Sequence, residues 1–185
     1  QINILVEYAK NQEQVNKSLQ AMNKEWNRHE LKFSYTKQGE FQLDPDPKLA
    51  SDLEEHLNRI AAHKATPYYE DFRLEIDNLE NDLNKINDVY NLLKQVLVKW
   101  QYLKSFFSKN KDDIGHQAGM EIAQFVKDNE NINKIFDSFK EKKIVKKCFT
   151  GKENNVEQAL SSLLYSFIGI EKAIADAAAY FNKKD

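Results

Sequence analysis

The side chains of this chain best suited to hold a metal or to carry a proton near neutral pH are its four histidines, His29, His56, His63 and His116. Asp52 and His56 are four residues apart and His63 is seven further on, so a carboxylate and two imidazoles share one face of a predicted helix. A zinc site needs three or four converging ligands, supplied in pairs by several helices. Asp113 with His116 is a weak second pair. We therefore expect solvated or capping histidines and no metal or cofactor site.

Two further motifs fail as catalytic or nucleotide sites. Gly151-Lys152 would fit a phosphate-binding loop only with Gly at 146 and Ser or Thr at 153, where the chain has Lys and Glu. Cys148 follows two lysines that could lower the pKa of its thiol, but no histidine base lies near it in sequence, so a buried structural thiol is the default. We expect no catalytic residue, and the chain itself not to be an enzyme.

Composition narrows the class of protein further. The 185 residues carry 27 basic and 29 acidic side chains, a net charge of −2, so nothing global predicts binding to nucleic acid or to an anionic membrane. No apolar run has the length of a membrane span, and there is no signal peptide. A single cysteine excludes an intramolecular disulfide and fits a reducing compartment. The chain starts at Gln1 with a helical pattern already present, which predicts a piece of a longer protein.

Charge is nevertheless uneven along the chain. Residues 66–90 hold seven acids against two bases, and residues 140–152 hold six lysines against one glutamate. Two solvated helix faces explain both blocks; the alternative is that they complement each other or a partner.

The strongest structural signal is an apolar seam whose members are spaced four and three residues apart in alternation: Phe72, Ile76, Leu79, Leu83, Ile86, Tyr90, Leu93, Leu97 and Trp100. This spacing predicts one helix over 67–107, about 60 Å long, because no Gly or Pro falls between Tyr68 and Phe107. The seam is either intramolecular core or a coiled-coil contact. A beam of this length favours a mechanical or scaffolding role.

Shorter elements precede the long helix. Apolar residues at helical spacing predict a helix over 2–26, with Leu5, Tyr8 and Trp26 among its inward positions. Alternation on both sides of Gly39 predicts a β-hairpin over 31–43. Asp46-Pro47 and Thr66-Pro67 are helix starts.

After the long helix, residues 108–113 are expected to form a loop. Two short helices, 114–126 and 132–145, a break at Thr150-Gly151 and a last helix from about Asn154 to Phe181 complete the prediction. The predicted fold is mainly α: a single domain over 1–185, an elongated helical bundle with one very long helix and a small β-hairpin.

The order of these pieces resembles the linker domain of dynein heavy chains, the N-terminal region that precedes the AAA+ motor ring. The resemblance lies in the helix ending near Trp26 and in four later motifs: the return strand Gly39-Glu40-Phe41-Gln42-Leu43, then Leu53-Glu54-Glu55-His56-Leu57, Ala65-Thr66-Pro67-Tyr68-Tyr69 and Trp100-Gln101-Tyr102-Leu103-Lys104-Ser105-Phe106-Phe107. Asp113-Ile114 fits the pair that follows. Ala118-Gly119 stand where the family has Leu-Pro, and the rod lacks a mid-length tryptophan, so the linker is a divergent one.

The resemblance implies a mechanical segment of a microtubule motor. It would transmit ATP-driven changes of an AAA+ ring outside this chain, with the ring modules of the same heavy chain as partners and microtubules and dynein subunits as indirect ones. The expected location is the cytoplasm and cytoskeleton, with the cilium or axoneme as a variant. The alternative is a helical scaffold or adaptor that holds a partner helix through the seam.

Overall fold

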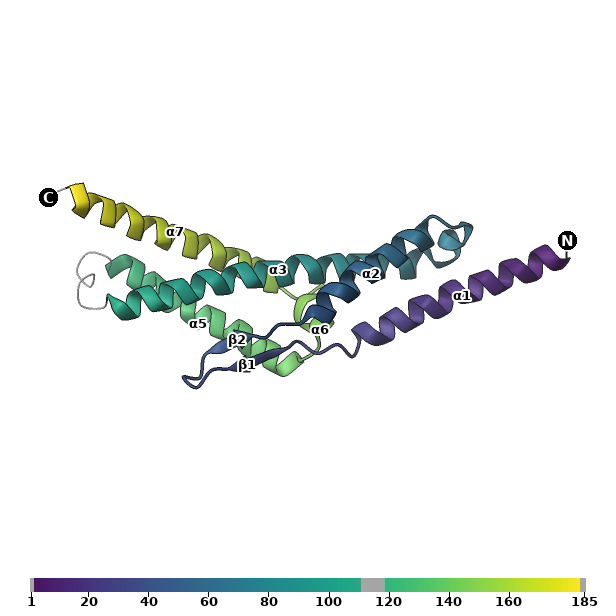
Figure 1. The fold of residues 1–185 in the computed structure, drawn as a ribbon, viewed down its shortest axis with the longest axis horizontal. Coiled ribbons are helices and arrows are strands. Elements are labelled where there is room, and N and C mark those ends of the chain that lie inside the picture. The colour runs from purple at the N-terminus through teal and green to yellow at the C-terminus, as the bar shows by residue number, and fades with distance from the viewer. Residues whose placement is uncertain (1, 111–118, 184–185) are drawn as a thin grey trace. The chain divides into compact units, whose positions relative to one another are not determined.

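The computed structural model describes residues 2–110 and 119–183, with side chains described as far as residue 179. Within this part the chain is mainly α-helical, as the sequence predicts (Figure 1). Its elements, in order, are α1 (Ile2–Trp26), β1 (Phe33–Tyr35), β2 (Phe41–Leu43), α2 (Pro47–Lys64), the 3₁₀ helix η1 (Pro67–Phe72), α3 (Arg73–Lys109), α5 (Gly119–Lys142), α6 (Val145–Phe149) and α7 (Val156–Lys183).

The chain folds into two compact units. Unit 1 comprises residues 1–88 with 142–152, and unit 2 comprises 89–141 with 153–185. Unit 1 therefore holds α1, the hairpin, α2, η1, the first part of α3 and α6, whereas unit 2 holds the rest of α3 with α5 and α7. A single domain over 1–185 stays a prediction.

The long helix is confirmed, with one correction at its start. Residues 67–72 form a 3₁₀ helix, and α3 then runs without interruption from Arg73 to Lys109. Pro67 is the first residue of the 3₁₀ helix. Its two tyrosines form hydrogen bonds with other helices: Tyr69 donates to Asp77 of α3 (2.6 Å), and Asn11 of α1 donates to Tyr68 (3.2 Å). The tighter turn is a common way for an α-helix to begin.

The seam lies in the core. All of its members are buried except Phe72 and Leu97, which are half-buried. The buried surface of α3 is wider than the predicted stripe, because Val89, Val96 and Leu103 are also buried. A face of this width is typical of a helix packed against two or more neighbours in a globular core.

The predicted hairpin is confirmed. Its strands pair antiparallel, with Ser34 opposite Gln42, and are shorter than the predicted span of 31–43. Gly39 has a φ of 78°, which an L side chain rarely adopts, and its N–H donates to the carbonyl of Thr36 at 2.8 Å. The sequence therefore places a glycine where the turn needs a left-handed residue.

One expectation between the long helix and the break is wrong. The pattern predicts two helices, 114–126 and 132–145, whereas α5 is one helix from Gly119 to Lys142. The polar stretch between the two predicted helices contains no Gly or Pro to end a helix, and its Asp128 is buried against α7. The chain turns at Lys143, whose φ of 64° is left-handed, before α6. The predicted loop over 108–113 begins too early, because Ser108 and Lys109 still belong to α3. Its residues from 111 onward and the predicted start at Ile114 lie outside the described residues.

The first helix also differs from its predicted face. Leu5 is 69% exposed and Tyr8 39% exposed, so only the positions from Val15 onward are buried. Tyr8 instead donates a hydrogen bond to Asp71 (2.6 Å) and packs on the Tyr68 ring. The predicted core position Phe181 lies beyond the described side chains.

Candidate functional site: polar junctions between helices

The end of α1 meets α2 in a polar junction, defined by Glu25, Trp26, His29, Asp46 and His56, of which Trp26, Asp46 and His56 are buried. Trp26 is the last residue of α1, Asp46 is the N-cap of α2, and His56 occupies an inward position of α2. His56 is 3% exposed, whereas Leu57, which continues the four-residue spacing of Leu49 and Leu53, is half-buried.

Hydrogen bonds fix the tautomer of His56. The Trp26 indole donates from Nε1 to His56 Nδ1 at 2.9 Å, and His56 Nε2 lies 3.2 Å from Glu25 Oε2. Since Nδ1 accepts a hydrogen bond, the proton of the neutral imidazole is assigned to Nε2, where it can be donated to the carboxylate. Both ring nitrogens of His56 therefore have polar partners within the protein.

Asp46 connects the α2 cap to the segment before the hairpin. Its Oδ1 accepts the N–H of Leu49 at 3.1 Å, and its Oδ2 accepts a hydrogen bond from His29 Nε2 at 2.7 Å. Burial acts to raise the pKa of Asp46, but the hydrogen bonds from His29 and Leu49 outweigh it and hold the pKa below its ordinary value. The carboxylate is thus ionised at neutral pH.

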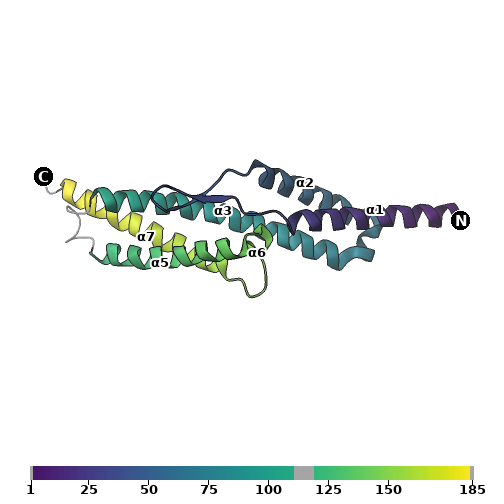
Figure 2. The ribbon, with the colours of Figure 1, turned by 90° about the horizontal axis from the view of Figure 1, so that it is seen from below.

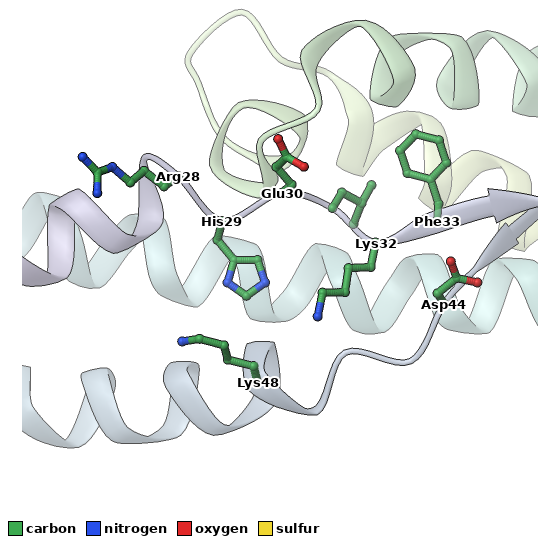
Figure 3. A pocket seen from close by; sticks show the side chains of 8 residues that line it. Arg28, His29, Glu30, Lys32, Phe33, Asp44 and Lys48 are labelled. Carbon is green, nitrogen blue, oxygen red and sulfur yellow. The ribbon is translucent and has the colours of Figure 1, made fainter.

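A cleft of about 570 Å³ opens beside this junction. Figure 3 shows His29 and Lys32 on one side of it and Lys48 of α2 on the other, with the side chains directed into the space between. Lys32 Nζ is 3.6 Å from Asp46 and Lys48 Nζ is 2.6 Å from Asp52, so both ammonium groups already face carboxylates. The cleft holds no nucleophile paired with a base.

Backbone pairing attaches α6 to the same part of unit 1. Leu31 N–H donates to the carbonyl of Lys143 at 2.8 Å, and Val145 N–H donates to that of His29 at 2.9 Å. These bonds join segments more than a hundred residues apart, and Lys146 Nζ lies 3.8 Å from Asp82 of α3. One member of the basic block therefore meets one member of the acidic block.

Unit 2 has a second polar junction, defined by Trp100, Gln124, Asp128, Asn129 and Ser166. Trp100 is 3% exposed and donates from Nε1 to Asn129 Oδ1 at 2.8 Å. Asp128 is 4% exposed and accepts hydrogen bonds from Ser166 of α7 and from Gln124 (2.9 Å). α3, α5 and α7 are thereby tied to one another, and Figure 2 shows α5 and α7 beside this half of α3.

The residues that the sequence singled out for metal binding do not converge. Asp52 pairs with Lys48, His56 with Trp26, and His63 Nε2 lies 2.9 Å from Ser18 Oγ. Burial and the nearby Arg59 charge lower the pKa of His63. Within the part of the chain that the structure describes, no three His, Cys, Asp or Glu side chains are grouped to hold a metal ion. Asp113 and His116 lie outside the described residues.

The cysteine and the Gly-Lys motif considered in the sequence analysis lie in the core and in a connection between helices, respectively. Cys148 is 1% exposed, and burial raises the pKa of its thiol to about 12, against the opposing charge of Lys142. Gly151, with a φ of 115°, lies in the connection between α6 and α7. Among the described helices, none is both long and apolar enough to cross a membrane.

Sequence reasoning missed how the tryptophans are held and missed Asp128 altogether. Each of these three residues has a hydrogen-bond partner on another helix, 29 to 38 positions away along the chain. Nothing local marks such pairs. The only available signal was a tryptophan or a carboxylate at an inward position of an amphipathic helix, which predicts that some polar partner must exist.

Comparison with known proteins then decides the family. A family model described as dynein heavy chain, N-terminal region 2, matches residues 1–184. The chain belongs to this family. The resemblance seen in the sequence is thus confirmed: this is part of the N-terminal linker region of a dynein heavy chain, a motor-protein family of the microtubule cytoskeleton.

Individual dynein relatives are similar at modest identity. A cytoplasmic dynein heavy chain of Neurospora crassa is 29% identical over 135 residues, which are 73% of this chain and 3% of the relative. That of Drosophila melanogaster is 38% identical over 64 residues, 35% of this chain and 1% of the relative. That of Fusarium vanettenii is 29% identical over 130 residues, 69% of this chain and 3% of the relative. The chain therefore spans a few per cent of the length of these relatives.

Proposed function

We propose that this chain is a mechanical segment of a dynein-type microtubule motor. It would transmit ATP-driven conformational changes of an AAA+ ring, formed by other parts of the same heavy chain, and would work in the cytoplasm at the cytoskeleton. Microtubules and other dynein subunits would be indirect partners. The observation that carries the proposal is α3, 37 residues without interruption, which supplies residues to both compact units.

The physical argument is one of stiffness. A helix bends little when its side chains are locked by packing, and α3 is packed from Ile76 in unit 1 to Leu103 in unit 2. Within each unit, a buried polar junction fixes the neighbouring helices to one another. A lever that serves a switch needs rigid parts of this kind, so that small changes at one end move the other.

The scaffold alternative is less well supported. It needs an apolar seam available to a partner helix, whereas every seam residue from Ile76 to Leu93 is buried by this chain itself. The same burial favours intramolecular core as the explanation of the heptad-like spacing.

The proposal is tested by breaking α3 at an exposed position. Asn91 lies on the solvent side of α3, where proline removes a backbone hydrogen bond and kinks the helix. In the parent heavy chain, Asn91→Pro should slow microtubule gliding while basal ATP hydrolysis continues, because the lever and the hydrolytic sites are separate. Asn91→Ala, which keeps the helix intact, is the matched control.

Circular dichroism of the variant chain must show that most of the helix content remains. Gliding at the normal speed by a folded Asn91→Pro motor would defeat the proposal. So would an equal loss of ATPase and gliding, since that result describes a damaged motor rather than an uncoupled one.

A further inference from the structure

The second segment of unit 1, residues 142–152, is strongly basic. It contains five lysines and no Asp or Glu, although the whole chain has a net charge of −2. The first segment of unit 1, residues 1–88, holds more acidic than basic side chains. The position of each lysine therefore decides whether the basic segment complements the rest of unit 1 or presents its charge to solvent.

The short helix α6 directs its apolar side inward and its lysines outward. Val145, Cys148 and Phe149 are each at most 1% exposed, so they anchor the segment in the core. Lys143 and Lys147, on the other side of the same turn of chain, are exposed, as is Lys142. The basic segment is thus a folded part of unit 1 with fixed positions for its charges.

An intramolecular complement accounts for one lysine of the segment. Lys146 is half-buried, its Nζ lies 3.8 Å from Asp82 of the acidic block, and the same atom donates a hydrogen bond to Asn27 (3.4 Å). Lys142, Lys143 and Lys147 are more accessible to solvent than Lys146. Their exposure leaves them able to meet a group from outside the chain.

A second segment extends the basic area. Arg28 is exposed and lies between Asn27, which accepts the hydrogen bond from Lys146, and His29, whose carbonyl accepts the N–H of Val145. Residues 27–32 contain a single acid, Glu30, so the two segments together carry seven basic side chains and one acidic one. We call the surface made by five of these residues the α6 basic surface: Arg28, Lys142, Lys143, Lys146 and Lys147.

The α6 basic surface is held together by the fold against its own repulsion. Like charges kept close to one another oppose the compact state, and a bound anion relieves that repulsion. The buried side of α6 and the backbone bonds to His29 and Leu31 prevent the lysines from moving apart with the chain. A preorganised set of cations of this kind is suited to a partner that carries several negative charges.

The side chains between the lysines narrow the class of that partner. Single-stranded nucleic acid needs exposed aromatic rings on which bases stack, whereas Phe149, the one Phe, Tyr or Trp of residues 142–152, is fully buried. A membrane site gains from large apolar side chains that insert among the lipids, but Val145 and Phe149 face the core. Lysines are compact charges on flexible stems, which adapt to carboxylates spaced along a peptide.

We propose that the α6 basic surface binds an acidic peptide segment of a separate partner protein. Complementary charge steers a diffusing partner toward such a surface and raises the rate of association. The interaction is therefore expected to form and dissociate quickly, and to weaken as salt is added, because exposed charges are screened. This inference is independent of the mechanical function proposed above.

The first test maps the contact in the unmodified parent heavy chain. A polyglutamate peptide is the probe, and a carbodiimide joins its carboxylates directly to lysine amines that they touch. Mass spectrometry should locate the joined peptide on Lys143 and Lys147. Lys172, an exposed lysine of α7 that directly follows Glu171, is the matched control and should react much less. Equal coupling at Lys172 would overturn the proposal.

The second test measures affinity by fluorescence anisotropy of the labelled polyglutamate peptide. The triple variant Lys142→Gln, Lys143→Gln, Lys147→Gln should bind it about tenfold more weakly, because three exposed ion pairs are lost. A control triple variant removes the same charge from exposed lysines elsewhere in unit 1, and it should bind normally: Lys10→Gln, Lys17→Gln and Lys37→Gln. Circular dichroism must show that both variants keep their helix content.

Three results of the affinity test would overturn the proposal. Equal weakening by the two triple variants would mean that only net charge matters. Unchanged binding by the Lys142, Lys143 and Lys147 variant would place the peptide elsewhere on the heavy chain. Tighter binding of phosphatidylserine vesicles or duplex DNA than of polyglutamate, lost in the same variant, would assign the α6 basic surface to a different class of partner.

Discussion

Asp46 shows how a local helix signal and a distant contact combine in one side chain. As the N-cap of α2 it satisfies a backbone N–H that would otherwise lack a partner, and the same carboxylate holds His29, 17 residues earlier. The cap could be predicted from Asp46-Pro47 alone. The contact with His29 could not, because it depends on how the chain returns after α1.

Because the pKa of Asp46 is lowered in the folded chain, the free energy of unfolding should decrease at low pH. The unfolded carboxyl has a pKa of about 3.9, and the folded one lies below this value, so between the two the unfolded chain binds more protons. The contribution of Asp46 is therefore fully present above about pH 4 and is lost as the pH falls through the folded pKa. Asp46→Asn should remove that part of the acid dependence.

The same variant isolates the charge at neutral pH. Asparagine still accepts the cap hydrogen bond, so Asp46→Asn should cost about 1.5–3 kcal/mol at pH 7, the range for a hydrogen bond to a charged group. Urea unfolding between pH 2 and 7 measures both effects, with the exposed Asp137→Asn as control. An unchanged pH profile would contradict the assignment.

In unit 2, Trp100 likewise combines a local role in its own helix with a contact to a distant segment. It is packed against Phe136, with ring centroids 5.2 Å apart, and its indole is bonded to Asn129. Trp100→Ala should cost about 3–5 kcal/mol, a large part of the 5–15 kcal/mol that stabilises a typical domain. Trp100→Phe should cost less, because it keeps most of the apolar contact. The exposed Gln101→Ala should shift the melting temperature very little, and an equally small shift for Trp100→Ala would refute burial of the indole.

At the scale of elements, the spacing of apolar residues predicted the helices and strands that form from local sequence alone. The alternating four and three spacing from Ile76 to Trp100 is sufficient for α3, and alternation around Gly39 is sufficient for the hairpin. The continuity of α5 between residues 126 and 132 could not be predicted in this way. Its polar residues resemble a loop, and Asp128 is acceptable at a buried position because Ser166 of α7 and Gln124 of α5 donate hydrogen bonds to it.

Lys143 gives a test of the turn between α5 and α6. A left-handed φ costs a residue with a Cβ about 1–2 kcal/mol, and glycine avoids that cost while losing some chain entropy. Lys143→Gly should therefore stabilise the chain by up to about 1 kcal/mol in urea unfolding. Asp137→Gly, inside α5, should destabilise it by a similar amount. If both substitutions destabilise, the left-handed turn at residue 143 is not formed in solution.

At the scale of the whole chain, two compact units share one helix. The boundary between them falls between Asp88 and Val89, in the middle of α3. Starting a separate helix on each side of a break is costly, whereas extending an existing one is favourable. The order of α3 in one unit should therefore support its order in the other. A single domain over 1–185 follows if this coupling is strong enough.

Cooperativity of unfolding measures the coupling. We expect the unmodified chain to unfold in one transition, with helix content by circular dichroism and tryptophan fluorescence changing together, because Trp26 reports on unit 1 and Trp100 on unit 2. Asn91→Pro interrupts α3 close to the boundary and should separate this transition into two while costing about 3 kcal/mol. Asn91→Ala should leave one transition. Two transitions in the unmodified chain would instead mean that the units fold independently, and a lever made of them would yield at residue 88 rather than transmit force across it.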